Sequence, residues 1–236
     1  MIAQPLLRHT RQTPVTHPSS AAPNASSAQS ESLAPWRSSL SRALHRNRSQ
    51  PFARYFQLAT VKPDLTPANR TVVFRGFMNN TNRLMTICDR RSQKTDQIHQ
   101  NSNAEACWYF TKTREQFRLA GQLTLITADT IEPNFCKARQ QLWQNISDNA
   151  RTQFAWPQPK APREPNDNAD IFSPPPPDST APLDTFCLLL LVPHSVDYLS
   201  LRGDPQTRML YTQQPKTSDS TESAPSSSWE SLTVNP

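Results

Sequence analysis

Short runs of β-branched and aromatic residues, separated by turn-forming residues, recur along most of this chain. They predict strands over 52–61, 71–78, 84–88, 106–110, 116–127, 186–192, 196–201, 208–213 and 229–234. Lys62-Pro63-Asp64 separates the first two runs as a turn. Many short strands at close spacing, with helices inserted between some of them, favour a mainly β fold: an antiparallel barrel with peripheral helices.

Three helices are expected beside these strands. In the first, Trp36, Leu40 and Ala43 recur at helical spacing, which favours a helix docked on the domain by an apolar stripe. Its arginines leave a basic helix for nucleic acid or membrane as the alternative. A second helix follows Ser92, which can cap it, and a third covers residues 136–154.

Composition divides the chain into one domain and several polar segments. Residues 1–31 are rich in Ser, Thr and Pro, so we expect a disordered extension before a domain over 32–236. Within the domain, 157–182 is a Pro-rich insertion and 214–228 a polar loop. We expect a cytoplasmic protein, or a plastid protein if residues 1–30 are a transit peptide.

Glycine is scarce, and this limits how the chain can bind phosphate. The three glycines are far apart in the sequence, whereas glycine-rich phosphate loops need them close together. Side chains must therefore hold any phosphate. The longest apolar run is too short to span a bilayer, and the scattered Cys and His residues do not have metal-site spacing. We expect neither a membrane span nor a metal.

The strand around residues 69–75 is the first candidate site. Alternation places Arg70 and Val72 on one face, and Thr71, Val73 and Arg75 on the other. A strand with an arginine near each end and apolar residues between can lie along a long ligand that has an anionic end. The alternative is an ordinary half-buried strand with solvated arginines.

The second candidate site is the start of the helix after Ser92. A helix N-terminus offers free N–H groups to an anion, and here Ser92 adds a hydroxyl while Arg91 and Lys94 add charge. Gln93 lies between them. The alternative is a simple cap followed by a basic first turn, which matches the helix dipole poorly unless an anion is bound.

Several separated motifs resemble, in one order, the pyridoxamine 5′-phosphate oxidase-like FMN-binding split barrels, and most closely their cyanobacterial and plant branch. The motifs are 33–38, 43–48, 69–76, 154–157, 201–203 and 208–211. The resemblance implies a split β-barrel, FMN as cofactor, and a homodimer with FMN at the interface.

The resemblance also implies which residues contact FMN. They are Arg70, Thr71, Val72, Val73, Arg75, Ser92, Gln93, Lys94, Gln116 and Arg208. Arg70, Ser92 and Lys94 would bind the phosphate, and Gln93 stands where the family commonly has an arginine. Gln116 would contact the flavin ring, with positive charge from Arg75 and Arg208 nearby.

The substrate side departs from the family pattern. The Tyr, Arg and Ser series of the true oxidases is missing from 131–153, and Asp204 and Gln206 stand where they have Arg and His. We therefore expect an FMN-dependent oxidoreductase acting on pyridoxamine phosphate or another small molecule, and assign no catalytic residue. One alternative is an FMN-binding protein without that turnover, such as a flavin reductase or carrier. A nucleic-acid module based on the net charge of +6 ranks last, because the chain has no basic run or stacking platform.

Overall fold

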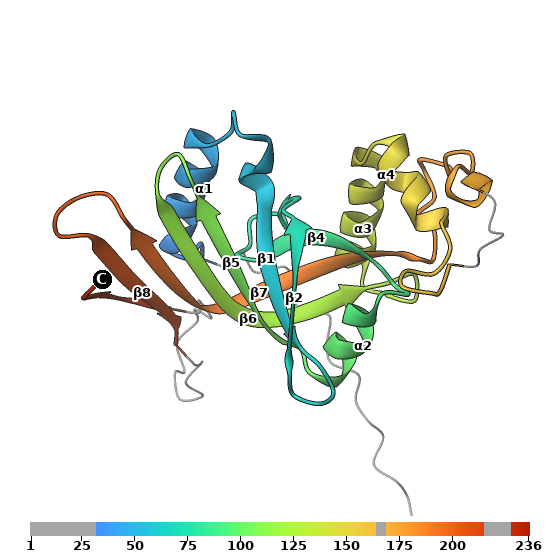
Figure 1. Ribbon diagram of the computed structural model, residues 1–236. Helices are drawn as coiled ribbons and strands as arrows, with labels where there is room; N and C mark the ends of the chain where they lie inside the picture. Colours follow the sequence, from blue (N-terminus) through green and yellow to red (C-terminus); the bar gives the residue numbers. More distant parts are fainter. Residues whose placement is uncertain (1–31, 164–168, 215–227) are drawn as a thin grey trace, which may run out of the picture.

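A computed structural model describes residues 32–163, 169–214 and 228–236 of the chain (Figure 1). The extension expected over 1–31 lies outside the described residues. So do residues 164–168 of the Pro-rich insertion and 215–227 of the polar loop. No helix in the described part is both long and apolar enough to cross a membrane.

Nine strands of the described part form one antiparallel sheet, which confirms the predicted mainly β split barrel. The strands are β1 Tyr55–Val61, β2 Pro67–Val73, β3 Gly76–Phe77, β4 Leu84–Asp89, β5 Asn103–Phe110, β6 Glu115–Ile126, β7 Phe186–Ser200, β8 Thr207–Gln213 and β9 Trp229–Val234. Their order is β2-β1-β5-β6-β7-β4-β3, with β8 and β9 added beside the second half of β7. The sheet curls strongly along this order (Figure 1).

The curl brings the two edges of the sheet together, because the chain passes directly from edge strand β2 to edge strand β3. The strand predicted over 71–78 is therefore two strands, and Gly76 begins the second with a φ of 118°. Arg75 N donates to Met85 O at 2.8 Å, while the preceding Phe74 N donates to Arg54 O at 2.7 Å. The chain is thus tied to β4 on one side and, on the other, to the residue just before β1.

β7 is the longest strand of the described sheet. It pairs with β4 through its first half and with β8 through its second half. The sequence predicts two strands here, ending at 192 and beginning at 196, but the structure has one. Opposite β6, Ala120 pairs with Ser195 and Gly121 with Pro193, which leaves His194 as the extra residue of a β-bulge. Gly121 is required there, because a Cβ atom would lie 2.3 Å from the Val192 carbonyl oxygen.

Four α-helices cover the described sheet: α1 Trp36–Arg46, α2 Gln93–Gln100, α3 Pro133–Asn145 and α4 Asp148–Thr152. Trp36, Leu40 and Ala43 of α1 are fully buried, which confirms the predicted docked helix. Short 3-10 turns cover Pro51–Arg54, Gln153–Ala155 and Ala169–Phe172. In Figure 1, α1 packs on one side of the curled sheet, and α3 and α4 lie together at another end.

The single helix predicted over 136–154 is in fact two helices. α3 begins earlier, at Pro133, because the Glu132 carboxylate accepts hydrogen bonds from the N–H groups of Asn134 and Phe135 at 3.1 and 2.7 Å. α4 starts after Ser147, whose hydroxyl accepts from Ala150 N at 3.3 Å. Both caps satisfy N–H groups that a helix start leaves free.

Two apolar clusters form the core. One lies inside the curl around Trp108 and includes residues of α1, β1, β5 and β6. The other lies between α3 and the first half of β7, where Trp143, Phe154 and Phe186 contact one another at ring-centroid distances of 5.0–5.9 Å. β7 supplies residues to both clusters, so it links the two halves of the domain.

Because the Tyr198 phenol is buried and hydrogen-bonded, we expect the free energy of unfolding to fall at high pH. Burial, together with a 2.8 Å hydrogen bond to Glu115 Oε1, raises the pKa of Tyr198 to about 12. An unfolded tyrosine ionises near pH 10, so the contribution of this group is fully present below pH 10 and is lost as the pH rises to about 12. We expect the loss to be about 1–3 kcal/mol of unfolding free energy.

Urea unfolding between about pH 9 and 12 would measure this loss. The control is Tyr198→Phe, which removes the titrating hydroxyl and should flatten the pH profile relative to the wild type. Parallel profiles for the two proteins would contradict the prediction.

Candidate functional site

A cavity of about 480 Å³ lies where the curled sheet brings β2 close to β4. We call it the central cavity. It is lined by Arg70, Thr71, Val72, Val73, Arg75, Ile87, Cys88, Asp89, Lys94, Ala150, Gln153, Phe154, Trp156 and Pro159. β2 and β4 supply two walls, and α2 and the α4 region supply the others. Six of the ten residues predicted to contact the cofactor therefore lie around one space of the size typical for ligand pockets.

Arg70 brings a positive charge to this cavity that no carboxylate in the described part neutralises. Its guanidinium donates to Leu58 O at 3.0 Å, to Thr60 Oγ1 at 2.7 Å and to Gln97 Oε1 at 3.1 Å. These acceptors are neutral, and partial burial lowers the pKa of the guanidinium. The side chain is thus held in place at a position where an anion would stabilise its charge.

Arg75 is a second cation beside the same cavity that makes no ion pair within residues 32–163, 169–214 and 228–236. Its Nε is buried and has no hydrogen-bond partner among the described residues. Burial, and then the nearby charge of Arg54, lowers the pKa of this guanidinium. A buried donor without a partner is costly, so this atom points to a ligand that carries acceptors.

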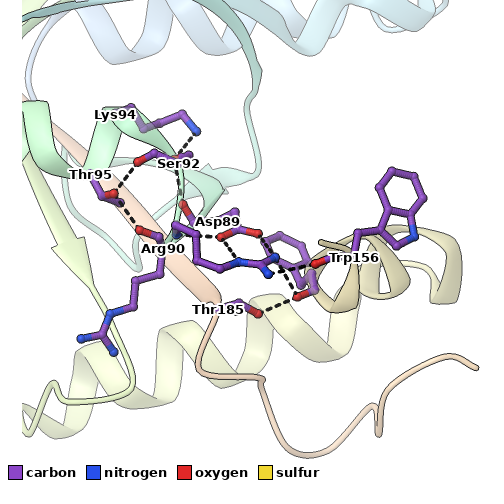
Figure 2. Close-up of polar contacts among 9 residues, drawn as sticks. Asp89, Arg90, Ser92, Lys94, Thr95, Trp156 and Thr185 are labelled. Carbon is purple, nitrogen blue, oxygen red and sulfur yellow. Dashed lines mark hydrogen bonds and ion pairs between the residues drawn. The ribbon is translucent and has the colours of Figure 1, made fainter. Parts of the chain in front are cut away.

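The start of α2 brings Ser92 and Lys94 together, as predicted (Figure 2). Lys94 Nζ donates to Ser92 Oγ at 2.9 Å, and Ser92 Oγ donates to Asp89 O at 2.8 Å. Ser92 stands at the N-cap position, but its hydroxyl accepts no bond from the helix N–H groups, so the expected cap is wrong. Its hydroxyl instead positions the Lys94 ammonium.

The sequence predicts that Arg91 adds charge to the anion site, but the structure pairs it with Asp89 instead. Its guanidinium binds the Asp89 carboxylate through two hydrogen bonds, of 3.0 and 2.7 Å, which raise the pKa of Arg91. It also donates to Trp156 O at 2.8 Å, and Figure 2 shows Asp89 and Trp156 around these contacts. The pair neutralises the one carboxylate that lines the central cavity, and ties the α4 region to β4.

A second space of about 520 Å³, which we call the basic cavity, adjoins the first. It is lined by Lys62, Pro67, Ala68, Asn69, Arg70, Ser92, Gln93, Lys94, Gln97, Pro159 and Lys160. Arg70, Lys94 and Pro159 line both spaces. With Ser92 and Gln93 included, eight of the ten predicted residues line one cavity or the other.

Gln116 and Arg208 are the two predicted residues that line neither cavity. They lie on β6 and β8, and both pair in register with Leu199 of β7, so they share one face of the sheet. The Arg208 guanidinium donates to both oxygens of Asp197 at 3.0 and 2.7 Å. Within one chain, the fold does not bring this pair of residues to Arg70 and Lys94.

Sequence reasoning missed the part of the site supplied by the segment after α4. Gln153, Phe154, Trp156, Pro159 and Lys160 all line a cavity. The one signal in the sequence was the 154–157 motif, which the resemblance identified without a role. In the described residues, no group of three or more His, Cys, Asp or Glu side chains could hold a metal ion.

Comparisons with known proteins agree with this architecture. A family model described as the FMN-binding domain of pyridoxamine 5′-phosphate oxidase matches residues 33–127. Pyridoxine/pyridoxamine 5′-phosphate oxidase 2 of Arabidopsis thaliana is 36% identical over 170 residues, which cover 72% of this chain and 85% of that protein.

Solved structures extend the likeness to nearly the whole domain. A pyridoxamine 5′-phosphate oxidase-related, FMN-binding protein of Nostoc punctiforme is 53% identical, with a TM-score of 0.78, and the match covers 87% of this chain and 100% of that one. PhzG of Burkholderia lata is 16% identical, with a TM-score of 0.64, and shares the fold. The match covers 92% of this chain and 98% of that one. Together with the described split barrel, these matches confirm the resemblance: the chain belongs to the pyridoxamine 5′-phosphate oxidase-like family of FMN-binding proteins.

Proposed function

We propose that this chain binds FMN in the central cavity and acts as an FMN-dependent oxidoreductase on a small molecule. The observation that carries the proposal is the convergence of Arg70, Arg75 and Lys94 on one cavity whose only lining carboxylate, Asp89, is already paired with Arg91. Such a space carries a net positive charge and favours an anionic ligand.

The residues around the cavity fit FMN in charge and shape. The phosphate is a multivalent anion, suited to the guanidinium of Arg70 and the ammonium of Lys94. The apolar lining from Val72, Ile87 and Phe154 suits a flat aromatic ring. The Nε of Arg75, which has no partner among the described residues, supplies a donor for a ring or ribityl acceptor.

Each group has a separate role in this proposal. Arg70, Ser92 and Lys94 hold the phosphate, while Arg75 places positive charge beside the ring. FMN, when bound, supplies the hydride chemistry, and the protein orients it and favours its reduced anionic form electrostatically.

We propose further that the chain is a homodimer with FMN at the interface. This accounts for Gln116 and Arg208, which would contact the cofactor of the second copy from the face of the sheet they share. Their face also carries Tyr109, which pairs with Gln116 and is 44% exposed. Light scattering on the FMN-loaded protein should give twice the chain mass, and a fully loaded monomer would overturn this part.

The second candidate is an FMN-binding protein that does not oxidise pyridoxamine phosphate, such as a flavin reductase or carrier. Asp204 and Gln206 favour it, because both are exposed residues of the β7–β8 loop and stand where the true oxidases have Arg and His. An acidic residue there is poorly suited to a phosphorylated substrate.

One series of measurements tests these proposals. The purified chain should take up one FMN per chain and release it on denaturation; a protein that stays colourless with added FMN would contradict both candidates. Without oxygen, bleaching of the flavin by pyridoxamine phosphate selects the oxidase. Bleaching only by a reduced nicotinamide selects the reductase.

A further inference from the structure

The basic cavity contains more positive charge than the predicted phosphate site accounts for. Besides Arg70 and Lys94 it is lined by Lys62 and Lys160, and no Asp or Glu is among its lining residues. None of these four cations makes an ion pair within the described part of the chain. Its remaining polar lining consists of neutral hydroxyl and amide side chains, from Asn69, Ser92, Gln93 and Gln97.

Lys160 is held at this cavity by a hydrogen bond to α2 and by the turn of its own segment. Its ammonium donates to Gln93 Oε1 at 2.6 Å, which links the Pro-rich segment to the first residue of α2. The backbone of Lys160 has a φ of 65°, in the left-handed region that residues other than glycine rarely adopt. A turn closed by Ala161 N and Gln158 O at 3.2 Å surrounds it. Strain of this kind persists where surrounding contacts require one orientation.

The base of the segment is also fixed. The Trp156 carbonyl accepts from Arg91, and the Trp156 ring contacts the ring of Phe172 at a centroid distance of 5.7 Å. Pro159, the neighbour of Lys160, lines both cavities. The segment therefore extends from the wall of the central cavity to the rim of the basic cavity.

We propose that Lys160 is a further phosphate-binding residue of the FMN site, positioned by Gln93, and that it makes the site select FMN over riboflavin. This inference rests on the proposed function. A neutral amide at position 93 contributes no charge of its own, but it accepts one of the three N–H donors of Lys160 and leaves two for a phosphate. The segment after α4 thus supplies a cation beside position 93, where α2 itself has only a neutral amide.

Flavin affinity of the apoprotein tests this inference without reference to catalysis. Lys160→Gln should weaken FMN binding roughly 3- to 10-fold, as expected for one exposed charge on a multivalent anion, and should leave riboflavin binding unchanged. The affinity of the variant for FMN should also depend less steeply on salt. Fluorescence quenching of each flavin measures both affinities.

Three variants complete the design. Lys160→Arg keeps the charge and should retain most of the preference for FMN, whereas Gln93→Ala removes the positioning bond and should lose part of it. Lys137→Gln is the control, because Lys137 is an exposed lysine of α3 that lines neither cavity. Its affinity for both flavins should match that of the wild type.

The possible results separate the two proposals. Equal FMN affinity in wild type and Lys160→Gln overturns the role of Lys160 and leaves FMN binding itself intact. An equal loss for FMN and riboflavin also overturns it, because that pattern shows a structural role. A wild-type chain that binds neither flavin overturns the proposed function, and the role of Lys160 with it.

Discussion

The Arg70→Met variant is expected to bind FMN roughly 10- to 150-fold more weakly than the wild type, the equivalent of a charged hydrogen bond worth about 1.5–3 kcal/mol. The effect is large because Arg70 lines both cavities and is already held by Leu58, Thr60 and Gln97. Little ordering of the side chain is then required when the phosphate arrives. Titration of the apoprotein with FMN measures the change.

Arg46→Met is the matched control, since Arg46 is an exposed arginine near the end of α1 that lines neither cavity. Arg70→Lys separates charge from geometry: it should bind better than Arg70→Met, yet worse than wild type, because an ammonium cannot make the same forked contacts. Circular dichroism would confirm that each variant is folded. Wild-type FMN affinity in folded Arg70→Met would show that the phosphate lies elsewhere.

Replacing Trp108 with alanine should lower the free energy of unfolding by about 3–5 kcal/mol. The indole is fully buried in the cluster inside the curl and contacts the rings of Phe56, Phe74 and Phe110 at centroid distances of 5.1–5.2 Å. Its Nε1 also donates to Ala53 O at 3.0 Å. Truncation leaves a cavity and a buried carbonyl without its partner.

The control for this variant is Ile131→Ala. Ile131 is 93% exposed and lines neither cavity, so its truncation should cost much less. Urea denaturation of both variants gives the comparison. Equal losses would mean that the cluster inside the curl is not the main stabilising core.

Local patterns predicted the elements of the fold better than their connections. α1 follows from its apolar stripe, and β4 from a run of apolar residues, because both signals lie within one segment. The break between α3 and α4 depends on Ser147 as a cap, a signal present in the sequence but outweighed by helical spacing on both sides. The continuity of β7 through Pro193 could not be read locally. Residues 192–194 have no ladder partner on the β4 and β8 side. The missing N–H group of Pro193 is therefore tolerated there.

In the candidate site, too, residues within one continuous motif were predictable from the sequence, and residues positioned by distant contacts were not. The strand bearing Arg70 and the helix start bearing Lys94 were identifiable, because each motif is continuous in sequence. The contribution of Lys160 depends on a turn 67 residues after Gln93 and on a left-handed backbone, neither of which composition reveals. Arg91 was misassigned because its partner Asp89 is two residues away, and nothing in the spacing shows which way the guanidinium turns.

The β-bulge at His194 also determines which residues of β7 face inward. Before His194 the odd-numbered Cys187, Leu189 and Leu191 face the cluster inside the curl, and after it the even-numbered Val196 and Tyr198 do. Deleting that single residue would leave a regular strand with Val196 and Tyr198 still inside, whereas closing the bulge with His194 retained would turn the second half over and place the Asp197 carboxylate in an apolar interior. The bulge opposite Gly121 therefore lets the alternating pattern of β7 accommodate one extra residue, and a change that closed it with His194 present would alter every inward-facing position of the second half of the strand.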